Sequence, residues 1–280
     1  MIYETLNLRE FYPALSAEGG EPILQAYCRD VSREIDLGRR FPALLICPGG
    51  GYAFVSDREA EPMALDYLGA GFNAFVLTYS VAPARYPSAL LQAAAAMDYI
   101  RKNAAEYHVD PDKIAVCGFS AGGHLAGSLA CLWNGKCLAE TLKTTSSNLR
   151  PNAAILSYPV ITSGDKAHRG SFDNLCGDDR ALAQKMSLET AVTKDTPATF
   201  LWHTATDGCV PVENSLMMAS ALRENGIPFE LHIFAEGSHG LSTCTYQSAG
   251  PNSPNMVNPE AAKWFDLSVT FLKKQLDLKF

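Results

Sequence analysis

The sequence has no excess of positive charge and no long apolar run. It carries 23 Lys and Arg against 30 Asp and Glu, a net charge of −7, whereas proteins that work through phosphate contacts usually present a basic surface. No apolar run approaches the roughly 20 residues that cross a bilayer. These absences argue against nucleic-acid and membrane partners and leave a small molecule as the expected partner.

The N-terminus lacks the basic stretch followed by an apolar stretch that marks a secretory signal. The eight cysteines are spread over 280 residues and form no CxxC pair, so we expect buried, reduced thiols rather than a disulfide framework. Together these features predict a cytoplasmic protein. They leave open a homo-oligomer and an export signal that has been trimmed.

Motifs for metals and nucleoside phosphates are also missing. The sequence has no HExxH and no Cys/His cluster, so no metal site is expected. No Lys-Ser or Lys-Thr follows the glycine run at 49–51 at the spacing of a phosphate-binding loop. Glycoside hydrolysis needs two facing carboxylates, and no motif in the sequence indicates such a pair.

Apolar residues make up 47% of the chain and charged residues 19%, which is typical of a packed globular core. Short apolar runs alternate with longer helical patterns, and runs such as 43–47 contain no polar residue, as in strands covered on both faces. The expected strands are 23–28, 43–47, 73–79, 114–117, 153–158, 199–203 and 229–234, and the expected helices are 59–69, 88–107, 121–133, 212–225 and 259–274. This alternation predicts an α/β fold with a mostly parallel central sheet and helices on both faces.

We expect residues 1–280 to form a single domain with a possible cap insertion at about 159–197. The insertion is polar, separates two expected strands and contains one expected helix, 179–190. Residues 242–259 are rich in Ser, Asn and Pro and are predicted to form a surface loop.

Residues 118–122 read Gly-Phe-Ser-Ala-Gly and stand directly between an expected strand and an expected helix. A bare GxSxG pattern arises by chance in roughly one chain in ten of this size. A strand, a sharp turn and a helix around it form the nucleophile elbow, which holds the serine at the tip of the turn. The context therefore predicts Ser120 as a nucleophile.

A nucleophilic serine needs donors for the oxyanion that forms when it attacks a carbonyl. Residues 48–52, Pro-Gly-Gly-Gly-Tyr, follow an expected strand at the place of a second oxyanion loop. Glycines leave their backbone amides accessible, so the expected donors are the amide of Ala121 with that of Gly50 or Gly51.

The serine also needs a base, and six histidines compete for that role. His239 follows the last expected strand and comes after Ser120 in the chain, as the order of such sites requires. The other histidines are expected to be structural or to line the site (His124, His203 and His232) or to lie at the surface (His108 and His168).

The acid should fall between the serine and the histidine, after the strand that precedes the last helix–strand unit. Asp207 meets this description and would fix the tautomer of the imidazole. The weaker candidates lie in the expected insertion or before the strand: Asp165, Asp173, Asp178, Asp179 and Asp195. Cys209, two residues beyond Asp207, is expected to pack rather than to line the site.

The motifs PGGGY, GFSAGGH, DGCVP and EGSHG occur in this order. The sequence thereby resembles the α/β-hydrolase esterases and lipases related to hormone-sensitive lipase, especially the bacterial group often labelled acetyl xylan esterase or, misleadingly, xylanase. The resemblance runs from about residue 23 to the last helix and implies a carboxylic ester hydrolase with the triad Ser120, Asp207 and His239 and no cofactor. Pro48 stands where the lipase branch has His, so that branch's substrate preferences do not carry over.

The expected reaction is acyl transfer through an acyl-enzyme, on short acyl esters that include acetyl esters of sugars. Two alternatives remain open at this point. One is a serine exopeptidase of the same fold, although such relatives usually carry an extra domain. The other is a non-catalytic, hydrolase-like receptor, although such proteins usually lack a triad residue.

Overall fold

A computed structural model describes residues 1–279. In this part of the chain eight strands form one sheet, in the order β1-β2-β4-β3-β5-β6-β7-β8. Strand β2 runs antiparallel to both β1 and β4, and every other neighbouring pair is parallel. The strands are β1 (Ile2–Asn7), β2 (Ile23–Cys28), β3 (Phe41–Cys47), β4 (Asn73–Thr78), β5 (Val109–Phe119), β6 (Ala154–Ser157), β7 (Thr199–Thr204) and β8 (Phe229–Phe234).

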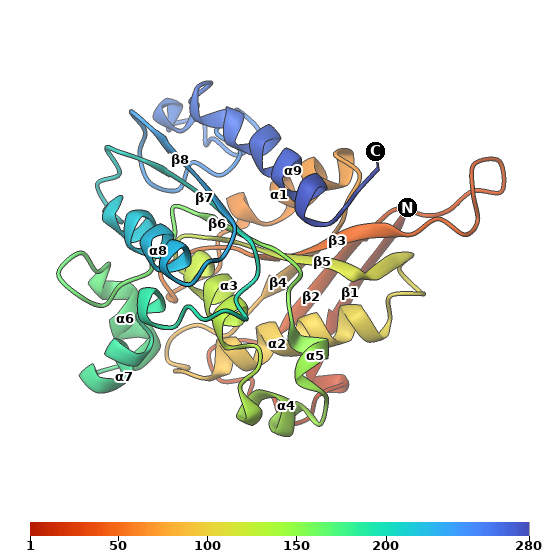
Figure 1. The fold of residues 1–280 in the computed structure, drawn as a ribbon, viewed down its shortest axis with the longest axis horizontal. Helices are drawn as coiled ribbons and strands as arrows, with labels where there is room; N and C mark the ends of the chain where they lie inside the picture. The colour runs from red at the N-terminus through yellow and green to blue at the C-terminus, as the bar shows by residue number, and fades with distance from the viewer. Residues whose placement is uncertain (280) are drawn as a thin grey trace.

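Helices cover both faces of this sheet (Figure 1). Helices α1 (Glu61–Gly69) and α9 (Trp264–Gln275) pack on one face, and α2 (Ser88–Lys102), α3 (Ala121–Leu132) and α8 (Glu213–Glu224) pack on the other. Successive side chains of a strand point to opposite faces, so β3 contributes Leu45 to one core and Leu44 and Ile46 to the other. The predicted α/β fold is confirmed.

All seven expected strands are present, and two of them, β2 and β8, have the predicted bounds. Strand β1 was not predicted, because its exposed and covered positions alternate at the edge of the sheet and it contains no apolar run. The helix expected at 88–107 ends at Lys102, and the one expected from 59 begins at Glu61. Two short helices, α4 (Lys136–Leu142) and α5 (Ser146–Leu149), were also missed.

The segment 159–197 holds two helices and a 3-10 turn in place of the single helix predicted at 179–190, so that prediction is wrong. These elements are α6 (Arg169–Cys176), α7 (Arg180–Lys185) and η3 (Leu188–Thr190). Gly177 has a φ of +63°, which ends α6, and the Asp179 carboxylate accepts a hydrogen bond from the Leu182 amide and begins α7. The description of this segment as a cap stays a prediction.

The predicted surface loop at 242–259 is exposed only in part. Ser242, Thr243 and Cys244 are buried, and the Trp264 indole donates a hydrogen bond to the Ser242 carbonyl at 3.0 Å. Two 3-10 turns, η4 (Pro254–Met256) and η5 (Ala261–Lys263), precede α9. All eight cysteines are free thiols, and no helix within residues 1–279 is long and apolar enough to span a bilayer.

Parallel strands present their carboxyl ends at one edge of the sheet, where ligands of α/β proteins collect. The loops that follow β3, β5, β7 and β8 all begin at this edge, which lies to the left in Figure 1. Each of these loops carries part of the predicted site.

Candidate active site

Ser120 occupies the turn between β5 and α3 with φ 54° and ψ −120°. This is a strained conformation for a residue with a side chain. The two flanking glycines make it possible: a Cβ on Gly118 would lie 2.1 Å from the Gly122 carbonyl oxygen, and a Cβ on Gly122 would lie 2.1 Å from that of Cys47. The strand, turn and helix therefore hold the serine at the tip of an elbow, as predicted.

The structure brings the three predicted side chains together in one hydrogen-bonded chain. His239 Nε2 lies 2.7 Å from Ser120 Oγ, and His239 Nδ1 lies 2.7 Å from Asp207 Oδ2. An ionised carboxylate only accepts hydrogen bonds, so Nδ1 carries the proton and donates it to Asp207. Nε2 is then free to accept the proton of the serine hydroxyl.

The side chain of Asp207 is buried and surrounded by donors. Its Oδ1 accepts hydrogen bonds from the amides of Cys209 at 2.9 Å and Val210 at 3.0 Å, and His203 Nε2 lies 3.3 Å from Oδ2. Burial by itself raises the pKa of this carboxyl, but the hydrogen bonds from His203, His239 and the Cys209 amide outweigh it and hold the pKa well below its ordinary value. Asp207 is therefore ionised at neutral pH.

Each carbonyl of the glycine loop, from Pro48 to Gly51, accepts a hydrogen bond. Those of Gly49 and Gly50 accept backbone amides within the loop, and Asn174 Nδ2 donates to the Gly51 carbonyl at 2.9 Å. The hydroxyl of Tyr79 donates to the Pro48 carbonyl at 2.7 Å. These contacts fix the direction of every peptide group in the loop.

The amides of the same loop remain available. Within residues 1–279, neither Gly50 nor Gly51 donates a hydrogen bond from its amide. Ala121 is the first residue of α3, where an amide has no acceptor inside its own helix. These are the three predicted oxyanion donors, and their role stays a prediction.

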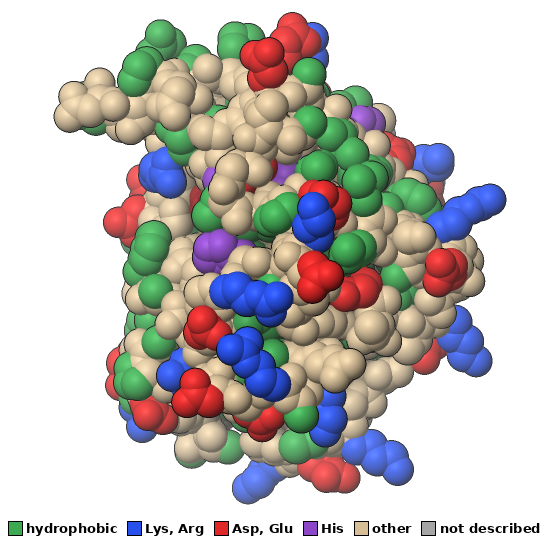
Figure 2. Space-filling model, turned by 90° about the vertical axis from the view of Figure 1, so that its left-hand side faces the viewer, with side chains coloured by type: hydrophobic (Ala, Val, Ile, Leu, Met, Phe, Trp, Pro, Cys, Tyr) green, Lys and Arg blue, Asp and Glu red, His purple; other side chains and the backbone are tan. Residues whose placement is uncertain are grey.

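A cleft of about 310 Å³ lies over these groups and is lined by Ser120, His239, Gly50 and Gly51, with further side chains from the segment 159–197. Figure 2 shows this face of the molecule, with histidine side chains visible on it. Within the described residues, no three His, Cys, Asp or Glu side chains are grouped so that they could hold a metal ion.

Two predictions about the surroundings are wrong. His168 is half-buried rather than a surface residue and lines the cleft; partial burial and the neighbouring His239 lower its pKa. Cys209 is exposed and lines the cleft instead of packing. His168 reaches the site because the start of α6 lies beside the glycine loop, which no local sequence pattern reveals. Cys209 is on the same loop as Asp207, two residues further along the chain.

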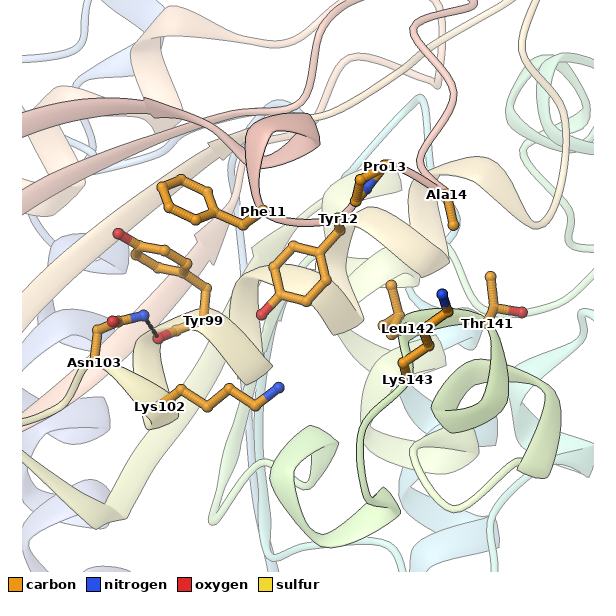
Figure 3. A pocket seen from close by; sticks show the side chains of 10 residues that line it. All are labelled: Phe11, Tyr12, Pro13, Ala14, Tyr99, Lys102, Asn103, Thr141, Leu142 and Lys143. Atoms are coloured by element: carbon orange, nitrogen blue, oxygen red, sulfur yellow. Dashed lines mark hydrogen bonds between the residues drawn. The ribbon is translucent and has the colours of Figure 1, made fainter.

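A different cavity, of about 440 Å³, lies near the C-terminal end of α2 (Figure 3). It is lined by Phe11, Tyr12 and Tyr99 with the side chains of Lys102 and Lys143. The serine, histidine and aspartate described above lie elsewhere, so the smaller cleft is the candidate active site.

A serine on a strand–helix elbow, with a histidine and an aspartate on loops after later strands, defines the class of this protein as an α/β-hydrolase. The chain matches the family described as BD-FAE over residues 30–222, more than half of its length, and belongs to that family. It is 40% identical over 206 residues to endo-1,4-beta-xylanase B of Butyrivibrio fibrisolvens, a match that covers 71% of this chain and 32% of that protein.

Two solved structures are similar over nearly the whole chain. The acetyl ester-xyloside bifunctional hydrolase from Caldicellulosiruptor lactoaceticus is 33% identical with a TM-score of 0.83, covering 99% of this chain and 97% of that one. The carboxylesterase Cest-2923 from Lactobacillus plantarum WCFS1 is 29% identical with a TM-score of 0.82, covering 98% of each chain. The predicted membership of an α/β-hydrolase family of the esterase and lipase type is confirmed. The chain spans about a third to a half of the length of the curated relatives that it matches.

Proposed function

We propose that this protein is a serine carboxylic ester hydrolase that acts on small acyl esters, including acetyl esters of sugars, through Ser120, His239 and Asp207. The observation that carries the proposal is the hydrogen-bonded chain from Ser120 Oγ through both nitrogens of His239 to Asp207, with 2.7 Å at each link. Ser120 and His239 line the cleft beside the amides of Gly50 and Gly51, which have no acceptor in the part of the chain that the structure describes.

The reaction has two halves. His239 Nε2 takes the proton of Ser120 while Oγ attacks the ester carbonyl, and the negative oxygen is bound by the amides of Ala121 and of Gly50 or Gly51. The tetrahedral intermediate collapses when the alcohol leaves with the proton from His239, and the acyl group stays on Ser120. Water then loses a proton to His239 and attacks the acyl-enzyme, and His239 returns this proton to Ser120 Oγ as the bond to the acyl group breaks and the acid leaves.

The size of the cleft and the names of the relatives support the substrate class. A volume of about 310 Å³ is at the lower end of the range for small-molecule sites. One similar structure is described as an acetyl ester-xyloside hydrolase and one relative as an acetylxylan esterase. The cytoplasmic location and a homo-oligomer stay predictions.

The proposal is tested with p-nitrophenyl acetate. We expect wild-type protein to hydrolyse this ester and Ser120→Ala to abolish the activity. A matched control is Ser128→Ala, on helix α3, which follows Ser120. Ser128 is buried, and its hydroxyl has no hydrogen-bond partner within residues 1–279, so its loss breaks no polar contact there. Activity of Ser120→Ala near that of wild type would overturn the assignment, and faster cleavage of peptidyl anilides than of esters would favour the exopeptidase.

A further inference from the structure

Glu59 is a buried carboxylate beside the cleft, outside the predicted site residues. It ends η2 (Asp57–Glu59), and 2% of its surface is exposed. Its Oε2 accepts a hydrogen bond from the Gly49 amide at 2.7 Å, and its Oε1 accepts one from the Tyr158 hydroxyl at 2.7 Å. Within residues 1–279 Glu59 forms no ion pair.

The first of these contacts fixes the glycine loop. The peptide group between Pro48 and Gly49 is held at both ends, because its carbonyl accepts from the Tyr79 hydroxyl and its amide donates to Glu59. The next two amides along the chain are those of Gly50 and Gly51. The Glu59 contact therefore fixes the peptide group at the start of the loop, and the bonds to the Gly49 and Gly50 carbonyls orient the two peptide groups that carry the expected oxyanion donors.

The second contact leads to the catalytic histidine. The Tyr158 hydroxyl accepts a hydrogen bond from the Ser242 amide at 2.9 Å, three residues after His239 in the chain. The Tyr158 ring packs edge-on against the imidazole of His239, with ring centres 5.1 Å apart. Glu59 and Tyr158 thus join the glycine loop to the loop that carries His239.

We propose that Glu59 is a positioning residue that holds the oxyanion loop and His239 in fixed positions relative to each other. Two donors point at this side chain, and a carboxylate accepts from both, whereas a carboxamide has one oxygen and one NH2 group. A buried charge without an ionic partner is costly for folding, so a role in the site gives a reason for its presence. This inference rests on the proposed esterase function.

The first test is Glu59→Gln, an exchange of nearly equal volume. We expect kcat for p-nitrophenyl acetate to fall roughly 10–100-fold, since misplaced oxyanion donors act on the transition state more than on the bound ester. KM should change less than about threefold for the same reason. Phosphonylation of Ser120 by a fluorophosphonate, which develops a similar oxyanion, should slow by a similar factor.

The second test combines the Glu59 substitution with a substitution of Tyr158, whose hydroxyl donates to Glu59. Tyr158→Phe removes one of the two donors, so in the double variant the oxygen of the introduced carboxamide is free to face the Gly49 amide. We expect the double variant to be no slower than Glu59→Gln. Losses that multiply would show that the two residues act independently and would overturn the proposal. Tyr158→Phe alone should lower kcat several-fold at an unchanged KM, which keeps the proposal testable if Glu59→Gln does not fold.

Asp98→Asn is the matched control. Asp98 is also a buried carboxylate that accepts from a tyrosine hydroxyl, that of Tyr12 at 2.6 Å, and Tyr12 lines the other cavity (Figure 3). Asp98→Asn should lower the melting temperature and leave kcat unchanged. A folded Glu59→Gln with kcat within twofold of wild type would overturn the role of Glu59. Activity that survives Ser120→Ala would instead overturn the esterase proposal itself.

Discussion

Asp207→Asn is the perturbation whose effect on the proposed site follows most directly from the geometry. The Asp207 Oδ1 accepts two backbone amides, those of Cys209 and Val210. An asparagine keeps both bonds only if its oxygen takes the place of Oδ1, which puts its NH2 group opposite His239 Nδ1. That NH2 is a donor, so the imidazole must accept on Nδ1 and carry its proton on Nε2. Nε2 then has no lone pair for the proton of Ser120.

The expected loss of kcat is large because the variant holds His239 in the tautomer that cannot accept the proton of Ser120. A wrong tautomer in a Ser-His-Asp site lowers kcat by about 10⁴-fold, which corresponds to about 5 kcal/mol at 1.36 kcal/mol for each factor of ten. KM should change little, since Asp207 does not line the cleft. The fold should persist, because the asparagine retains both amide contacts.

The assay is steady-state hydrolysis of p-nitrophenyl acetate, with circular dichroism to show that the variant is folded. Asp179→Asn serves as the control: it makes the same chemical change at the N-cap of α7, where Asn caps as well as Asp does. Its kcat should equal that of wild type. If folded Asp207→Asn retained kcat within tenfold of wild type, the proposed role of Asp207 in setting the tautomer would be refuted.

Two further predictions concern stability. Burial lowers the pKa of His124 to about 4 from its ordinary 6.5. Above pH 6.5 the imidazole is neutral in the folded and the unfolded protein, so it does not change the free energy of unfolding with pH. As the pH falls to 4 the unfolded protein binds the proton first, and the free energy of unfolding drops by about 3 kcal/mol. His124→Gln should remove this part of the pH dependence in urea unfolding; an unchanged slope would contradict it. Gly122→Ala places a Cβ 2.1 Å from the Cys47 carbonyl oxygen and should cost roughly 1–3 kcal/mol or more. Gly69→Ala, with open space around it, is the control, and equal stabilities would refute the close-packing argument.

The sheet and the order of the site residues could be predicted because their signals are local. Apolar runs such as 43–47 mark buried strands, and an elbow needs its glycines two residues either side of the serine. Asp207 and His239 follow from chain order, since each comes after a strand whose carboxyl end meets the same edge of the sheet. Strand β1 could not be predicted in this way, because it is an edge strand whose positions alternate in exposure and it contains no apolar run.

The groups that support the site could not be predicted, because they act across long sequence separations. Glu59 and Tyr158 are 99 positions apart, and Asn174 lies 123 positions from the Gly51 carbonyl that it binds. In the sequence Glu59 looks like the first residue of a helix. The surface position predicted for His168 is wrong because nothing near this residue in the sequence indicates that α6 packs beside the glycine loop. Such contacts depend on tertiary packing, which a single sequence does not encode in any periodic pattern.

Covalent labelling tests the central claim, that Ser120 is an activated nucleophile, most directly. Folded protein is treated with a fluorophosphonate and the adduct is located by peptide mass spectrometry. The account predicts one adduct per chain, on Ser120, no labelling of Ser120→Ala, and much slower labelling of Asp207→Asn than of Asp179→Asn. An adduct on another residue, or an unlabelled wild-type protein that still hydrolyses p-nitrophenyl acetate, would contradict it.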